Sequence, residues 1–277
     1  MKKLMSLISV LFAFTMVIFV MTSCKKSDDS SGPNEIQQAQ DNVKAEWIYE
    51  DAGNMAESGI SGSLNMKSGA DVLSNCATVT IDTVAIPHTL VIDFGNSNCL
   101  CNDGNYRKGK ILVQFMGRYF ETGSYHTISF EDYYINDNMV TGSRYVSNNG
   151  PDSLGFMNWT VTVAGELTLA NNAGSISWNA NRLRTLIQGA STPARLDDVY
   201  EITGSGSGSR LNGTEWTAII QTPLRLELSC MYRHPVSGEV LISIANKPDR
   251  HLNYGTGSCD NVATVAINGI SYNITLH

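Results

Sequence analysis

Apolar and polar residues alternate along most of this chain, from about Asn75 onward, in runs separated by glycine, asparagine and serine. Successive side chains of a β-strand point to opposite faces, so alternation gives a strand one apolar and one polar face. The pattern is clear from Trp159 to Leu169, where one parity is apolar and the other carries threonine and glutamate. Further strands are predicted at Lys108–Phe115, Tyr125–Tyr134, Met139–Ser147, Ser175–Ile187, Val199–Ser209, Thr214–Gln221, Leu224–Cys230 and Glu239–Ala245.

The last residues predict a β-hairpin. Asn268-Gly269, flanked by alternating apolar residues, is the strongest short signal for a two-residue turn. A shift of one residue would move the whole apolar set to the other face, so we expect the register to be fixed. The turn pairs Ile267 with Ile270, Val265 with Tyr272 and Ala263 with Ile274 on one face.

No long helical period interrupts these strands, so the sequence lacks the crossover helices that parallel strands need. We therefore predict an all-β fold: an antiparallel meander of long hairpins, forming a large sheet or a sandwich, in a single domain over residues 34–277. The segment Gly204–Ser209 has the composition of a linker, but strand residues lead into it and Asn212-Gly213 follows it. We interpret this segment as the bare end of a long hairpin.

One short helix is predicted, at about residues 34–56, where few residues are β-branched. Its apolar residues recur mostly three or four positions apart, as on one face of an amphipathic helix. We expect this face to pack on the β-rich body, and we expect Gly53, Gly59 and Gly62 to end the helix. The apolar residues are Ile36, Ala39, Val43, Trp47, Ile48 and Met55.

The first residues have the pattern of a bacterial lipoprotein signal. Lys2 and Lys3 precede an apolar run, and Met21-Thr22-Ser23-Cys24 follows as a lipobox-like tetrapeptide. This predicts removal of residues 1–23 and a lipidated Cys24 that holds the protein at a membrane, since each buried acyl CH₂ contributes about 0.8 kcal/mol. The alternative is a retained transmembrane helix, but the run is shorter than the roughly 20 residues that span a bilayer.

Composition restricts the partners. Residues 24–33 are small, polar and end in proline, which predicts a flexible tether. The signal carries two of the 19 basic residues and none of the 26 acidic ones, so the mature charge is 17 − 26 = −9. Because phosphate binding needs clustered lysine and arginine, we expect no nucleic-acid partner.

The cysteines predict two disulfides, because export through an oxidising compartment favours them. Phe94 stands five residues before Cys99, and Tyr254 stands five residues before Cys259. In both places a glycine follows the aromatic residue, and a hairpin that begins at another cysteine precedes it. This internal repeat predicts the pairs Cys76–Cys99 and Cys230–Cys259, each contributing about 2 to 4 kcal/mol.

Other pairings stay open, and Cys76–Cys101 is the main competitor. The Cys99-x-Cys101 spacing also suggests a metal site, but zinc takes four ligands and the five histidines are scattered along the chain. We predict no metal site and no cofactor.

Several stretches together resemble a family of uncharacterised all-β lipoproteins from Bacteroidota: CATVTIDT, VIDFGNSNC, RKGKILVQFMGRY, DDVYEITGSGSGS and SCDNVATVAINGISYNITL. The resemblance covers about residues 34–277 and implies an all-β body behind a lipid anchor in the outer membrane, without an assigned chemistry. The residues Lys25–Asp29 also look like the export tag of surface lipoproteins in this phylum, with Ser27 inserted. Surface and periplasmic placement both stay open.

The same resemblance suggests a modification. Bacteroidota add O-glycans to serine or threonine that follows aspartate and precedes an apolar residue, and Asp82-Thr83-Val84 and Asp152-Ser153-Leu154 resemble that motif. The resemblance therefore implies O-glycans on Thr83 and Ser153. The alternative is that both are ordinary turn residues.

Motifs of common enzymes are missing: the sequence has no Gly-x-Ser-x-Gly, phosphate loop or His-Glu-x-x-His. Two acidic pairs occur, Glu131-Asp132 and Asp197-Asp198, but neighbouring strand residues point to opposite faces. We interpret both pairs as charges at strand ends that protect exposed edges. The turn Asn136-Asp137-Asn138 has one carboxylate, far short of the six to eight oxygens that calcium takes.

Aromatic residues gather in the middle strands, and burial is the commoner outcome for such large side chains, although exposed ones suit glycan or protein binding. They are Tyr119, Phe120, Tyr125, Tyr133, Tyr134 and Tyr145. The sequence as a whole predicts a lipid-anchored envelope or surface lipoprotein with a non-catalytic structural or binding role. Its candidate partners, besides the membrane, are a glycan and an envelope protein. The alternative is a carbohydrate-active or peptide-cleaving enzyme that gathers carboxylates from distant loops.

Overall fold

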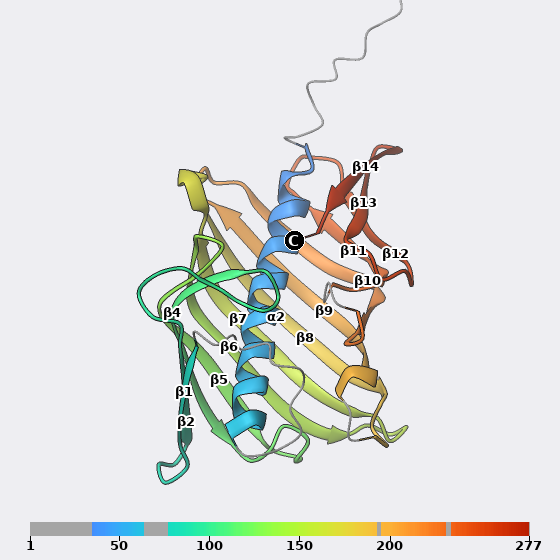
Figure 1. The fold of residues 1–277 in the computed structure, drawn as a ribbon. Coiled ribbons are helices and arrows are strands. Elements are labelled where there is room, and N and C mark those ends of the chain that lie inside the picture. Colours follow the sequence, from blue (N-terminus) through green and yellow to red (C-terminus); the bar gives the residue numbers. More distant parts are fainter. Residues whose placement is uncertain (1–34, 64–76, 193–194, 231–233, 277) are drawn as a thin grey trace, which may run out of the picture. The chain divides into compact units, whose positions relative to one another are not determined.

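A computed structural model describes residues 35–63, 77–192, 195–230 and 234–276 of the 277-residue chain (Figure 1). These residues form a 14-stranded antiparallel sheet and a long helix, α2 (Gln37–Ser63), which confirms the predicted all-β meander with an N-terminal helix. The strands are β1 (Thr78–Asp82), β2 (His88–Asp93), β3 (Cys99–Leu100), β4 (Tyr106–Met116), β5 (Tyr125–Ile135), β6 (Asn138–Pro151), β7 (Met157–Thr168), β8 (Ser175–Gln188), β9 (Val199–Arg210), β10 (Glu215–Glu227), β11 (Ser237–Ser243), β12 (Arg250–Thr256), β13 (Val262–Ile267) and β14 (Ile270–Thr275). Two short 3₁₀ turns, Ala170–Asn172 and Arg195–Asp197, precede β8 and β9.

The strands pair in the order in which they occur in the chain. Every neighbour in the sheet is the next strand along the sequence, except that β2 pairs with β4 and the short β3 pairs with β4 beside this path. Within the described residues β1 and β14 are the edges, so the sheet is not closed. Helix α2 lies along one face of this sheet (Figure 1).

The predicted register of the last hairpin is confirmed. Val265 is opposite Tyr272, and the two flanking pairs are also as expected. The parity of β7 is confirmed as well, because Trp159, Val161 and Val163 are all buried on the helix-facing side. Alternation and one Asn-Gly turn therefore fix both the strands and the face that packs.

Two of the predicted strands are one strand. Thr214–Gln221 and Leu224–Cys230 lie largely within β10, which shifts register against both neighbouring strands between Ile219 and Arg225. Pro223 lies in the shifted segment, and proline cannot donate to a ladder, so it is tolerated at such a bulge. The strand continues through this irregularity without ending.

The helix is longer than predicted, because its glycines do not end it. Gly53 and Gly59 lie inside α2, where the helix approaches the sheet closely. A Cβ atom at Gly53 would lie 2.6 Å from Arg144 Nη1, and one at Gly59 would lie 3.1 Å from Leu90 Cδ2. These glycines serve close packing at the cost of helix propensity.

The polar side of α2 is buried together with its apolar side. Of residues 37–61, Gln40 is exposed and the others are buried or half-buried. Burying carboxylates is costly unless they are paired, and here each buried or half-buried carboxylate of the described helix from Asp41 onward meets an arginine of the β-rich body. The ion pairs are Asp41–Arg210, Glu46–Arg182, Glu50–Arg144, Glu50–Arg184, Asp51–Arg107 and Glu57–Arg195.

Glycines in the sheet make room for large side chains on the same face. Gly208 lies opposite both Trp178 and Trp216, and a Cβ atom there would lie 2.1 Å from the Trp216 ring. Gly165 leaves space for Tyr49 of the helix, whose hydroxyl donates a 2.8 Å hydrogen bond to the Thr141 carbonyl oxygen. The Gly204–Ser209 segment is the end of β9 next to the β9–β10 turn, which confirms its interpretation as the end of a hairpin. It also pairs with β8 on its other side, and its glycines have a packing role.

The Cys230–Cys259 disulfide is present, with a Cα–Cα distance of 5.5 Å, which confirms that predicted pair. Cys76 lies outside the described residues, so its pairing with Cys99 or with Cys101 stays a prediction. Cys101 is buried, and its thiol donates to the Cys99 carbonyl oxygen at 3.7 Å.

Cys24, the signal and the tether of residues 24–33 also lie outside the described residues. Among the described residues, no helix has the length and apolar character needed to cross a bilayer.

Candidate functional site

A cavity of about 710 Å³ lies at the C-terminal end of α2, and we call it the Glu57 cavity after the residue at its base. Three elements enclose it: the last turns of α2, the facing ends of β4 and β5 with the loop between them, and the segment that leads into β9. Its lining includes Glu57, Ile60, Phe115, Arg118, Tyr119, Phe120, Glu121, Tyr125, His126 and Arg195. This volume is typical of small-molecule sites.

The β4–β5 loop that covers one side of the cavity is held in place by hydrogen bonds. The Glu121 carboxylate accepts from the Arg118 amide at 3.1 Å, which closes the loop on itself. The Tyr119 carbonyl oxygen accepts from Asn148 Nδ2 at 2.8 Å and from Trp159 Nε1 at 3.0 Å. Because these donors belong to β6 and β7, the loop is attached to the sheet and the cavity wall is preformed.

Aromatic rings form that wall. Tyr119 stacks on the buried Trp159 with ring centroids 4.7 Å apart, and Phe120 meets the same indole edge-on at 5.5 Å. Phe120 is 46% exposed, so part of this ring faces solvent. Phe115 and Ile60 add apolar surface. The cavity can therefore take up a flat apolar group by stacking and edge contacts.

The base of the cavity carries an ion pair between the buried Glu57 and the half-buried Arg195. Burial opposes ionisation of Glu57, but the guanidinium groups of Arg195, Arg184 and Arg144 outweigh it and lower the pKa of this carboxyl. Burial likewise opposes the charge on Arg195, and Glu57 restores it by raising the pKa of the guanidinium. Both groups are thus charged at neutral pH and neutralise each other.

His126 is buried beside this pair and is neutral. Burial first, and the nearby Arg144 second, lower its pKa to about 4. Burial raises the pKa of the Tyr119 hydroxyl, which keeps its proton. Tyr119 Oη and His126 Nε2 are both buried without a hydrogen-bond partner among the described residues. Both atoms are shielded from solvent, so they face the packed interior and not the open space of the cavity.

A second layer of charge lies behind the cavity. Glu50 bridges Arg144 and Arg184 with two contacts of 2.8 Å, and the Arg184 guanidinium lies 3.9 Å from the centroid of the Tyr200 ring. Because these arginines lie next to His126 and Glu57, they tune both groups without lining the cavity.

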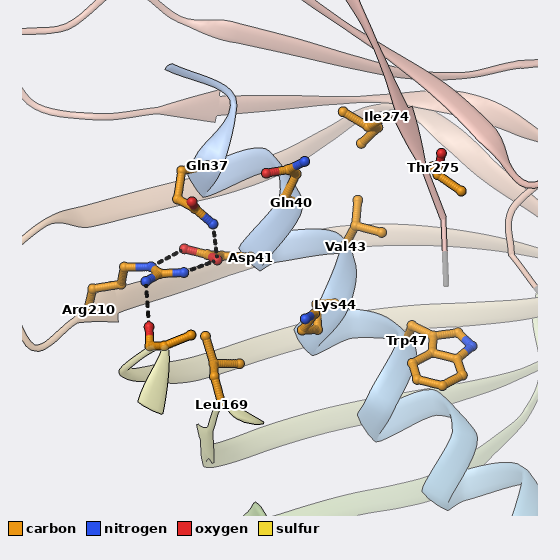
Figure 2. A pocket seen from close by; sticks show the side chains of 11 residues that line it. Gln37, Gln40, Asp41, Val43, Lys44, Trp47, Leu169, Arg210, Ile274 and Thr275 are labelled. Carbon is orange, nitrogen blue, oxygen red and sulfur yellow. Dashed lines mark hydrogen bonds and ion pairs between the residues drawn. The ribbon is translucent and has the colours of Figure 1, made fainter. Parts of the chain in front are cut away.

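A smaller cavity of about 310 Å³ lies at the other end of α2 (Figure 2). Figure 2 shows the Arg210 guanidinium beside the carboxylate of Asp41. Its nitrogens donate to that carboxylate at 2.5 and 2.6 Å, and one donates to the Ala173 carbonyl oxygen at 3.2 Å. Gln37 Nε2 donates to the same carboxylate at 3.0 Å. These polar groups satisfy one another, so this cavity is the weaker candidate site.

The acidic pairs do not protect sheet edges, so that interpretation was wrong. Glu131 lies in β5, inside the sheet, and pairs with Lys110 of β4 at 2.6 Å. Asp198 is buried just before β9, another internal strand, where burial raises its pKa and the Tyr200 hydroxyl donates to it at 3.1 Å. The partners of these carboxylates are thus a lysine and a tyrosine, and neither contact brings two carboxylates together.

The two predicted glycosylation residues lie in exposed turns. Thr83 follows β1, and Ser153 lies between β6 and β7. In both turns the aspartate accepts a 2.8 Å hydrogen bond from the backbone amide two residues further along the chain. The donor is Val84 N for Asp82 and Leu154 N for Asp152. Enzymes could reach both hydroxyls, and their modification stays a prediction.

Three of the six clustered aromatics line the Glu57 cavity, namely Tyr119, Phe120 and Tyr125, while Tyr133 is buried in the core and Tyr145 is exposed. Sequence reasoning missed Glu57, His126 and Arg195. Within the part of the chain that the structure describes, no three histidine, cysteine or acidic side chains converge to hold a metal ion.

No family model, no curated protein and no solved structure matches this chain.

Proposed function

We propose that this protein is a lipid-anchored, non-catalytic binding protein of the cell envelope, held at the outer membrane through Cys24, whose binding site is the Glu57 cavity. The cavity itself is the observation that supports binding most directly. It is large enough for a small molecule, its aromatic wall is preformed, and most of the surface that its residues expose is apolar. The anchor rests on the lipobox-like motif, and the placement in the outer membrane rests on the resemblance to Bacteroidota lipoproteins.

Binding fits these residues better than catalysis does. The buried carboxylate Glu57 is already paired with Arg195, so it is not a base poised near neutral pH. His126, with its pKa at about 4, is uncharged at neutral pH and is a poor general acid there. The charged groups therefore keep the cavity rigid and neutral, and the aromatic wall supplies the contact area.

The binding proposal can be tested with a fluorescent probe. The full chain in lipid nanodiscs is titrated with N-phenyl-1-naphthylamine, and empty nanodiscs give the blank. We expect a saturable rise in probe fluorescence that Phe120→Ala weakens about tenfold, because this ring contributes apolar contact. Phe156→Ala is the matched control, since Phe156 is 38% exposed and lies outside the cavity.

A rise that does not saturate, or one that both variants weaken equally, would overturn the proposal. Turnover of glycans or peptides that depends on an acidic residue would favour the enzymatic alternative.

The anchor is tested separately. Cys24→Ala should move the protein out of the membrane fraction while its urea unfolding curve stays unchanged. Protease treatment of intact and lysed cells then distinguishes the surface from the periplasm. A processed Cys24→Ala protein that stayed in the membrane fraction would contradict the lipid anchor.

A further inference from the structure

The last strand of the sheet has an open edge. β14 pairs with β13 alone, and no strand of the described residues lies on its other side. Leu276 donates to the Asn261 carbonyl oxygen at 2.7 Å, so the even-numbered residues of β14 bond to β13 by the alternation of an antiparallel pair. The backbone amides and carbonyls of Ser271, Asn273 and Thr275 therefore point away from the sheet.

This edge lacks the features that usually keep edge strands from pairing with other chains. Such features are charged side chains, prolines and bulges. The strand Ile270–Thr275 has no charged residue and no proline, and it pairs with β13 without a register shift. β14 is therefore a template on which an extended peptide can add a strand.

The smaller cavity, beside the N-terminal half of α2, reaches this edge (Figure 2). Ile274 and Thr275 both line it, although neighbouring strand residues point to opposite faces, so the cavity extends around the edge of β14. Val43 and Trp47 of the helix supply apolar surface to it. A strand added to β14 would thus lie beside the helix and direct every second side chain into this cavity.

The net charge of the cavity lining is positive. Asp41 and Arg210 neutralise each other there. Lys44, the one basic residue of α2, also lines the cavity, is half-buried and enters no ion pair within the described part of the chain. An acidic side chain of an added strand would gain an attraction to Lys44, whereas a basic side chain would be repelled.

We infer that the edge of β14 binds an extended acidic peptide of a partner protein, which adds a strand to the sheet and pairs a carboxylate with Lys44. This surface is separate from the Glu57 cavity and from the function proposed for that cavity. A second copy of the chain that offered its own β14 would bring no acidic residue.

Fluorescence anisotropy with labelled heptapeptides tests this surface on the full chain in nanodiscs. The probe alternates valine and glutamate, and two counterparts carry glutamine or lysine in place of glutamate. A fourth peptide has the probe sequence with a methyl group on every backbone nitrogen, which removes the donors that pair with a strand. We expect the probe to bind saturably and the methylated peptide to bind about tenfold more weakly or worse, since each hydrogen bond changes affinity about 2- to 10-fold. The lysine peptide should also bind more weakly than the probe.

Two variants test the individual contacts. Asn273→Pro removes an outward amide of β14 and should weaken probe binding about tenfold, while its urea unfolding midpoint stays close to that of the wild type because β13 does not use this amide. Lys44→Gln should weaken probe binding about fivefold, the upper range for a partly exposed ion pair, and should leave binding of the glutamine peptide as it is. Lys247→Gln, on an exposed lysine outside the cavity, is the matched control.

Each outcome decides. Equal binding of the probe and its methylated form, or full binding by Asn273→Pro, would overturn strand addition, and the methylated peptide alone decides this if Asn273→Pro does not fold. A lysine peptide that binds as tightly as the probe, or equal losses in Lys44→Gln and Lys247→Gln, would overturn the assigned charge of the partner. Absence of saturable probe binding would overturn the peptide site. A concentration-dependent dimer that Asn273→Pro abolishes would mean that this edge joins two copies of the chain instead.

Discussion

Replacement of Glu50 by glutamine tests the ion pairs that hold α2 against the face of the sheet. Its two carboxylate oxygens each contact a different arginine at 2.8 Å, Arg144 and Arg184, whose side chains are 1% and 2% exposed. At about 4 Å between charges and an effective dielectric constant of about 20, each attraction is worth about 4 kcal/mol. Glu50→Gln removes both attractions and leaves two buried guanidinium groups without this anion.

The expected loss of folding stability is smaller than the sum of the two attractions. In the wild type these attractions are partly offset by the free energy that it costs to remove the charged groups from water. Removing one partner of a buried pair typically costs about 3 to 5 kcal/mol, and we expect Glu50→Gln to lower the free energy of unfolding by that amount. Urea unfolding followed by tryptophan fluorescence measures it, since Trp159 and Trp178 are buried beside these strands. The midpoint should fall while the slope stays the same.

Glu131→Gln is the matched control. It makes the same substitution in the pair Lys110–Glu131, which is also short at 2.6 Å but whose side chains are 37% and 54% exposed. Exposed pairs contribute at most about 1 kcal/mol and are screened by salt. Equal losses in the two variants, or a loss below about 1 kcal/mol for Glu50→Gln, would refute the idea that buried pairs hold the helix.

Three further outcomes are expected. The pKa of His126 is lowered from 6.5 to about 4, so on acidification the unfolded state takes up a proton on this residue before the folded state does. The free energy of unfolding should therefore fall by up to about 3 kcal/mol between pH 6.5 and pH 4. His126→Gln should make the free energy of unfolding depend less steeply on pH in this range. Gly165→Ala should cost about 1 to 3 kcal/mol in urea unfolding, because its Cβ would lie 2.0 Å from Tyr49 Oη. Loss of the Cys230–Cys259 disulfide, which spans 29 residues, should lower the free energy of unfolding by about 3 to 4 kcal/mol. Urea unfolding of a variant with both cysteines replaced by serine measures this loss.

Each of these has a result that would contradict it. His251→Gln, on an exposed histidine, should leave the acid slope unchanged; an equal effect of both histidine variants would mean that burial of His126 does not set the slope. Gly165→Ala at wild-type stability would mean that the helix can move away from the sheet at no cost. Unaltered unfolding of the serine variant would show that the unfolded chain is not restrained by the disulfide.

Sequence patterns predicted the sheet well because its physics is local. Alternation places Val161 and Val163 on one face, and the Asn268-Gly269 turn sets the register of the last hairpin. The helix end was missed because the role of Gly53 and Gly59 depends on what approaches them from the sheet. A helix glycine that serves close packing has the same sequence signature as one that ends a helix.

The burial of the acidic residues of α2 had a signal that was not used. Arg182 and Arg184 share the parity of the buried Trp178 and Leu186 in β8, so they face inward. An arginine on the apolar parity needs an anion inside the protein, and the helix carries the acidic residues that can supply it. The Glu57 cavity itself was not predictable in this way, since Arg195 and Glu57 are 138 residues apart and meet through the fold of the whole sheet.

The ion pairs of α2 have a consequence for how the protein folds. A meander can form hairpin by hairpin, since each strand meets the next one along the chain, and such local contacts favour rapid, independent steps. The carboxylates of α2, by contrast, reach arginines 56 residues away for Asp51 and 169 residues away for Asp41. The helix is made early in synthesis, but its charges are satisfied only when β9 is in place. This delay couples the early and late strands into one cooperative unit, which should suppress fraying of hairpins from the edges of the open sheet.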